Sequence, residues 1–131
     1  MVFSGALAVT STSLKAVVPI DAVTGPVTIT NAIGTTTSTA IFKMLPRITG
    51  FPPEAELGST VVVSGTNLKK GATHPVVKVG SVAAVVVDSS PTEVTFTVPP
   101  LAVSSKITIT TADGTATGAM NLTVMPGFIG I

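Results

Sequence analysis

Histidine is the side chain on which zinc or acid–base chemistry would most depend, and this chain of 131 residues contains one, His74. A zinc site needs three or four ligands, and the sequence offers no Cys and no second His to join it. A Ser–His–Asp triad would depend on the same residue. Because His74 precedes Pro75 in a segment expected to form a loop, we predict a solvated loop residue rather than a ligand or a base.

Paired carboxylates could perform glycosidase chemistry. Glu54 and Glu56 are close in sequence, but we place them in a proline-flanked turn after a strand. The other acidic residues are predicted at strand ends or in turns, without the clustering that a calcium site needs: Asp21, Asp88, Glu93 and Asp113. We therefore predict no catalytic, cofactor-binding or metal-binding residues, and a protein that is not an enzyme.

Two weaker patterns add little. Asn121 and Thr123 form an Asn-x-Thr sequon, but it falls inside a predicted strand of a threonine-rich chain and is uninformative. The isolated glycines Gly34, Gly65 and Gly114 are predicted turn residues, because a phosphate cradle would need a following helix and none is expected.

The charge pattern excludes nucleic acid as a partner. The formal net charge is +1, the seven basic residues are scattered, and only Lys69 and Lys70 are adjacent. Binding through phosphates needs several cations on one face, often with aromatic side chains to stack bases, and this chain has no Trp and no Tyr.

The composition predicts strands as the elements that position these residues. Hydrophobic residues make up 45% of the chain and charged residues only 10%, so Thr, Ser and Gly supply most of the polarity. Val, Ile and Thr favour extended backbone. This profile is typical of extracellular and virion β-proteins. No apolar run is long enough to span a membrane, and we expect a strand rather than a signal peptide at the start, because the first positive charge is Lys15.

An internal repeat organises the chain. Residues 18–51 match residues 98–131 without a gap at a constant offset of 80, and the proline and glycine punctuation falls at equivalent positions. A period of this length is too long for a solenoid unit and suits a small sandwich domain.

One full period runs from about residue 46 to residue 124 and contains about seven short strands with turn signals between them. Alternating Val, Ile and Thr residues and the Asp-Gly turn at Asp113 indicate an all-β, immunoglobulin-like β-sandwich. The strands are expected at 46–53, 59–65, 76–80, 83–87, 93–98, 106–111 and 115–124.

The order of these motifs resembles the IPT/TIG family, the immunoglobulin-like domains of plexins, certain transcription factors and many bacterial surface proteins. The opening segments 46–53 and 61–68, with Gly58 between them, are similar to the start of such a domain. The closing segments 96–99, 107–110 and 114–117 are similar to its second half. The resemblance implies a spacer, adhesive or assembly module without catalytic residues.

We predict three parts: residues 1–45, the second half of a preceding repeat that begins with a mid-domain strand at 2–5; residues 46–125, a complete repeat; and residues 126–131, a strand-like tail. A half sandwich would leave an apolar face and a strand edge uncovered. The exposed residues would include Val2, Phe3, Leu7, Val17, Val27, Ile29, Ile41 and Phe42. Two accounts stay open: the half repeat packs on the full one or remains partly disordered, or a neighbouring copy covers it, with residues 126–131 as the donated strand.

The expected function is that of a non-catalytic structural or adhesive module in an extracellular assembly, such as a cell-surface array, a filament or a virion decoration. Its partners would be proteins, most simply other copies of itself or neighbouring repeats. The alternative is a carbohydrate-binding accessory module of a secreted protein, although sugar platforms usually carry the exposed Trp or Tyr that this chain lacks.

Overall fold

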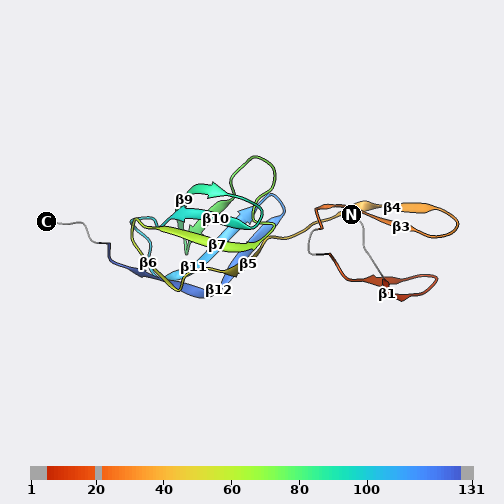
Figure 1. Cartoon of the computed structure of the whole chain (residues 1–131), viewed down its shortest axis with the longest axis horizontal. Coiled ribbons are helices and arrows are strands. Elements are labelled where there is room, and N and C mark those ends of the chain that lie inside the picture. Colours follow the sequence, from red (N-terminus) through yellow and green to blue (C-terminus); the bar gives the residue numbers. More distant parts are fainter. Residues whose placement is uncertain (1–5, 20–21, 128–131) are drawn as a thin grey trace. The chain divides into compact units, whose positions relative to one another are not determined.

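The structure, a computed structural model, describes residues 6–19 and 22–127 and divides the chain into two compact units. Unit 1 is Met1–Met44 and unit 2 is Leu45–Ile131. Every regular element among the described residues is a strand (Figure 1). The predicted all-β class is therefore confirmed.

Unit 2 is one curled sheet of eight strands in the order β5-β7-β10-β9-β8-β11-β12-β6. Neighbours are antiparallel except β12 and β6, which are parallel. The strands are β5 (Arg47–Gly50), β6 (Glu54–Glu56), β7 (Thr60–Thr66), β8 (Val76–Val79), β9 (Val82–Ser89), β10 (Glu93–Thr97), β11 (Ser105–Thr111) and β12 (Gly114–Met125).

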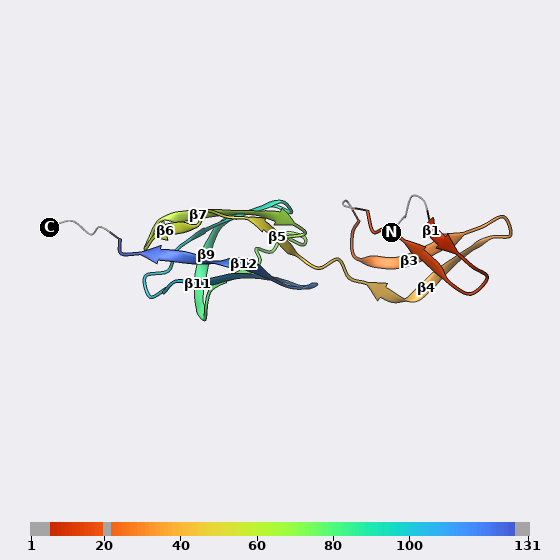
Figure 2. The same cartoon turned by 90° about the horizontal axis from the view of Figure 1, so that it is seen from below.

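The long strand β9 turns this sheet into two layers. Its first residues, Val82 to Ala84, pair with β8, and its later residues, from Val85 to Ser89, pair with β10. β7 and β11 consequently lie on opposite sides of the unit (Figure 2). This is the layered arrangement of an immunoglobulin-like sandwich.

The core lies between the layers and follows from period-two alternation in the strands. In β7, Val61 and Val63 are buried while the residues on either side of each are exposed. β11 buries Ile107 and Ile109 from the opposite layer. The other fully buried large side chains are Phe96, Leu68, Leu122, Val77, Val79, Val94 and Val98.

The structure corrects two details of the predicted strands. Glu54 and Glu56 belong to the short strand β6 rather than to a turn, since residues 54–56 pair in parallel with the end of β12. The strand predicted at 83–87 extends to Ser89, because it pairs with β10 as well as β8.

Unit 1 consists of two separate hairpins. β1 (Ala6–Val9) pairs with β2 (Leu14–Ala16), and β3 (Gly25–Thr30) pairs with β4 (Thr35–Phe42). The strand predicted at residues 2–5 lies outside the described residues, as does most of the predicted tail; its described part, Pro126 and Gly127, is not in a strand.

The hairpins of unit 1 repeat the pairing of unit 2 at the offset of 80. Ile29 pairs with Thr36 as Ile109 pairs with Ala116, and both hairpins carry a register shift at the same place. β1 and β2 likewise pair as β9 and β10 do: Val9 lies opposite Leu14, and Ser89 lies opposite Val94.

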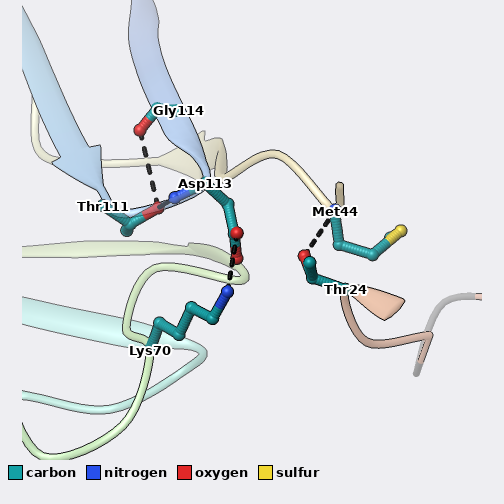
Figure 3. A network of polar contacts seen from close by, with 6 residues as sticks. All are labelled: Thr24, Met44, Lys70, Thr111, Asp113 and Gly114. Atoms are coloured by element: carbon teal, nitrogen blue, oxygen red, sulfur yellow. Dashed lines mark hydrogen bonds and ion pairs between the residues drawn. The ribbon is translucent and has the colours of Figure 1, made fainter. Parts of the chain in front are cut away.

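Side-chain hydrogen bonds recur at the same offset. The Thr30 and Thr35 hydroxyls are 2.8 Å apart, as are those of Thr110 and Thr115. The Met44 amide donates to Thr24 Oγ1 at 2.8 Å (Figure 3), and the corresponding Val124 amide donates to Ser104 Oγ at 2.9 Å. The local geometry of the two segments is therefore the same.

Candidate functional surfaces

His74 is exposed, as predicted, but it is tied to the core by a contact that the sequence did not indicate. Its Nδ1 lies 2.6 Å from Ser89 Oγ, and Ser89 is only 7% exposed. Lys69 Nζ donates to the Ser89 carbonyl at 3.1 Å, and Asp88 Oδ1 accepts from the Ser89 amide at 2.8 Å. This arrangement fastens the loop before β8 to the end of β9, and it buries the hydroxyl that a nucleophile would have to expose.

The described acidic residues lie on β6, near strand ends and in a turn. Glu54 and Glu56 are both exposed on β6, on either side of the buried Ala55. Glu93 is exposed at the start of β10, and Asp21 lies outside the described residues. Within residues 6–19 and 22–127, no group of three or more His, Cys, Asp or Glu side chains is placed to hold a metal ion.

Asp113 lies in the turn between β11 and β12, as predicted, and it also forms an ion pair. Its Oδ1 lies 2.7 Å from Lys70 Nζ, and its amide donates to Thr111 Oγ1 at 3.2 Å (Figure 3). The Asp113 side chain is 11% exposed and that of Lys70 is 48% exposed. Because Lys69 and Lys70 both bind groups of unit 2, the one adjacent pair of cations in the sequence serves the loop and does not form a basic patch.

The sequon lies on the exposed side of β12, and two of the three glycines, Gly65 and Gly114, occupy positions that favour glycine. Asn121 and Thr123 are exposed on β12, on either side of the buried Leu122. Gly65 is required by packing, since a Cβ there would collide with the Arg47 carbonyl oxygen. Gly114 has a φ of 153°, which favours glycine at the β11–β12 turn.

The outward faces of the two long hairpins carry matching sets of four threonines. In unit 1 they are Thr28, Thr30, Thr35 and Thr37, and in unit 2 they are Thr108, Thr110, Thr115 and Thr117. Thr28 lies opposite Thr37, and Thr30 lies opposite Thr35. Each set presents methyl and hydroxyl groups without charge. We call these sets the threonine faces.

The inward faces of the same hairpins differ in how far they are covered. Ile109 is fully buried in unit 2, whereas its counterpart Ile29 is 43% exposed. Leu122 is fully buried, whereas its counterpart Phe42 is 40% exposed. Within the described part of unit 1, Ala22, at 8% exposed, is the one buried hydrophobic residue.

Five residues of unit 1 correspond to buried residues of unit 2 but are themselves exposed or half-buried: Leu14, Val18, Val27, Ile29 and Phe42. We call this set the open face. Its existence was predicted from the sequence. Of the residues named in that prediction, Val2 and Phe3 lie outside the described residues; Val17 and Ile41 are exposed but are not counterparts of core residues.

The described residues contain no helix that could cross a membrane.

Comparison with solved structures shows the same fold in much larger proteins. The extracellular region of plexin A4 aligns with 87% of this chain at 18% identity and a TM-score of 0.56. A protein crystallised with a xylogluco-oligosaccharide aligns with 92% at 19% identity and a TM-score of 0.56. The SGBP-B protein of the Bacteroides ovatus mixed-linkage glucan utilization locus, in complex with a heptasaccharide, aligns with 95% at 20% identity and a TM-score of 0.52.

This chain spans 10%, 28% and 36% of those three proteins, respectively. No curated protein sequence matches it. The IPT/TIG domain family matches residues 46–124, which is more than half of the chain and nearly the whole of the described unit 2. Together with the two-layered strand order of unit 2, this match shows that the chain belongs to the IPT/TIG domain family.

Proposed function

We propose that this chain is a non-catalytic structural or adhesive module of an extracellular assembly, and that it acts through strand edges and sheet faces. The observation that carries the proposal is the open face of unit 1, where core-type residues such as Ile29 and Phe42 are about two-fifths exposed. Large apolar side chains gathered on one face mark sites of protein contact in soluble proteins.

The polar residues support a structural role. The Ser89, Lys70 and Asp113 side chains make hydrogen bonds or ion pairs within unit 2. No buried side-chain nitrogen or oxygen among the described residues lacks a hydrogen-bond partner. Such a unit has stable loops and presents little reactive chemistry, which suits a module that holds its neighbours in place.

The mass of the chain in solution tests this proposal. Light scattering over a range of concentrations is expected to give masses that rise above the 13.0 kDa of one chain as neighbouring copies cover their open faces. Replacing Ile29 with Asp should suppress that rise, because a charge cannot be buried there without a partner. A single mass of one chain at every concentration would contradict self-contact.

A carbohydrate-binding role is the second candidate. It is favoured by the likeness to two proteins whose structures contain oligosaccharides and by the threonine faces, whose hydroxyls can bond to sugar hydroxyls. The absence of Trp and Tyr from the sequence means that stacking on sugar rings would have to be replaced by hydrogen bonds.

Titration with xyloglucan and mixed-linkage glucan oligosaccharides tests the second candidate. If the threonine face of unit 2 binds, the double change Thr108→Val and Thr117→Val should abolish the heat of binding, since it removes two hydroxyls and preserves side-chain shape. Changing Thr123 to Val, on the same strand but outside the threonine face, is the control. No binding of either glucan by the unchanged chain would exclude these ligands.

A further inference from the structure

We propose that unit 1 binds a two-stranded β element which supplies counterparts of β7 and β8, and that binding completes a second sandwich on the hairpins of unit 1. This inference rests on the proposed function and names the partner of the open face by its chemistry.

The first argument is the shared register. β1 and β2 repeat the pairing of β9 and β10, and β3 and β4 repeat that of β11 and β12, each at the offset of 80 and each with the same register shift. Unit 1 thus has the geometry of four of the eight strands of unit 2, and the described residues contain no counterparts of β5 to β8 in that unit.

The second argument is what covers the equivalent surface of unit 2. There β10 pairs with β7, and β11 pairs with β8. These two strands direct Val61, Val63, Val77 and Val79 into the core, and all four are buried. In unit 1, β2 and β3 each belong to a sheet of only two strands. A two-stranded hairpin is marginally stable in water without a further layer, so unit 1 gains most from a partner at these two strands.

The third argument restricts the occupant. Gly118 packs against Phe51, and a Cβ there would lie 2.8 Å from a Phe51 ring carbon. The counterpart of Gly118 in unit 1 is Ser38, whose hydroxyl donates to the Ala40 carbonyl and accepts from the Val27 amide. A ring placed like that of Phe51 would collide with this serine. The partner therefore resembles β7 and β8 but carries no large residue in the position of Phe51.

The same reasoning disfavours the tail as the occupant. Residues 126–131 resemble the β5 region, and in unit 2 β5 pairs with β7. The described part of unit 1 has no counterpart of β7 with which a donated β5-like strand could pair. A counterpart of β7 would have to bind to β2 before a β5-like strand could pair with it.

A peptide with the sequence of residues 53–81 is the direct probe, because it contains β6 to β8 and begins after Phe51. Added to the full, isotope-labelled chain, it should cause saturable NMR shifts in β2 and β3. A peptide carrying Val63→Asp should bind at least about 10-fold more weakly, because Val63 faces the core, whereas Val62→Asp should bind like the unchanged peptide, because Val62 faces outward.

Changes in the chain give the matching test. Ile29→Asp, on the open face, should weaken binding of the unchanged peptide at least about 10-fold. Ile33→Asp, at the turn of the same hairpin and 95% exposed, should leave it unchanged. Shifts confined to β10 and β11, which would mean strand exchange in unit 2, or binding insensitive to Ile29→Asp, would overturn the inference.

A fused version covers the case in which the free peptide aggregates. Residues 53–81 placed directly before Val2 restore the spacing of unit 2, where residue 81 precedes Val82. Hydrogen exchange of the β2 and β3 amides should slow by about 100-fold or more in this fusion. Unchanged exchange of these amides in the fusion would overturn the inference. The proposed function is tested separately: it would still stand if the unfused chain associates with rising concentration.

Discussion

The hairpins β3–β4 and β11–β12 have the same register, the same register shift and the same outward threonines, yet only the second lies in a core. Ile29 and Ile109 occupy equivalent positions, and one is 43% exposed while the other is fully buried. The pairing within a hairpin is thus a local property, set by the turn and the β-branched residues. The stability of each residue depends instead on the layer that covers it.

The largest expected difference between the two units is in the hydrogen-exchange rates of their backbone amides. The amides of β11 are expected to exchange about 1,000-fold more slowly than those of β3, because opening β11 requires disruption of the unit 2 core. Equal protection of the two hairpins in NMR-detected exchange would mean that unit 1 has a covering layer in solution.

Matched isoleucine changes should show the next largest effect. Ile109→Ala is expected to lower the free energy of unfolding by about 2–5 kcal/mol, because it leaves a void in a packed core. Ile29→Ala should change it by less than about 0.5 kcal/mol.

Urea unfolding followed by far-UV circular dichroism suits this isoleucine comparison, since the chain has no Trp or Tyr for fluorescence. Similar losses from both changes would contradict the difference in burial.

Equivalent turn glycines offer a smaller contrast. Gly114 has a φ of 153°, and a Cβ added there would lie 2.7 Å from Leu45 Cδ2, so Gly114→Ala should cost about 1–2 kcal/mol. Gly34 has no such φ and no heavy atom within 4 Å of an added Cβ, so Gly34→Ala should be nearly neutral. Thermal unfolding of the two variants measures the difference, and a neutral Gly114→Ala would show that the turn adapts.

The ion pair of unit 2 should have the smallest effect. Lys70→Ala is expected to cost about 0.2–1 kcal/mol, and less at high salt, because the lysine is about half exposed. Lys78→Ala, on the exposed side of β8, is the control. In unit 1 the counterpart of Asp113 is Ile33, so no equivalent pair exists there. A cost for Lys70→Ala that does not respond to salt would indicate lost packing rather than lost charge.

Most of the fold could be predicted from the sequence, because alternation in segments such as 59–65 and the Asp113-Gly114 turn signal are local features. The short strand β6 could not, since three residues directly after Pro53 are too few to show a period and its pairing depends on β12, about 70 residues later.

The polar contacts were less accessible to sequence reasoning. The sequence did not identify Ser89 as the partner of His74, because serines are common at strand ends. The burial of Ser89 depends on the loop that folds over it. The open face could be anticipated, however. The match between residues 18–51 and residues 98–131 showed which core residues recur in unit 1, where no strands were expected to cover them.

The parallel pairing of β6 and β12 decides how unit 2 responds to mechanical tension. Three residue pairs join the start of the unit to its last strand: Glu54 with Thr123, Ala55 with Val124, and Glu56 with Met125. When the chain is pulled from both ends and β5 has yielded, these two strands are drawn in opposite directions along a shared axis. The three pairs then bear the load together in shear instead of opening one after another. The pairing of β6 with β12 therefore resists extension of unit 2 until all three residue pairs break together and β6 slides along β12.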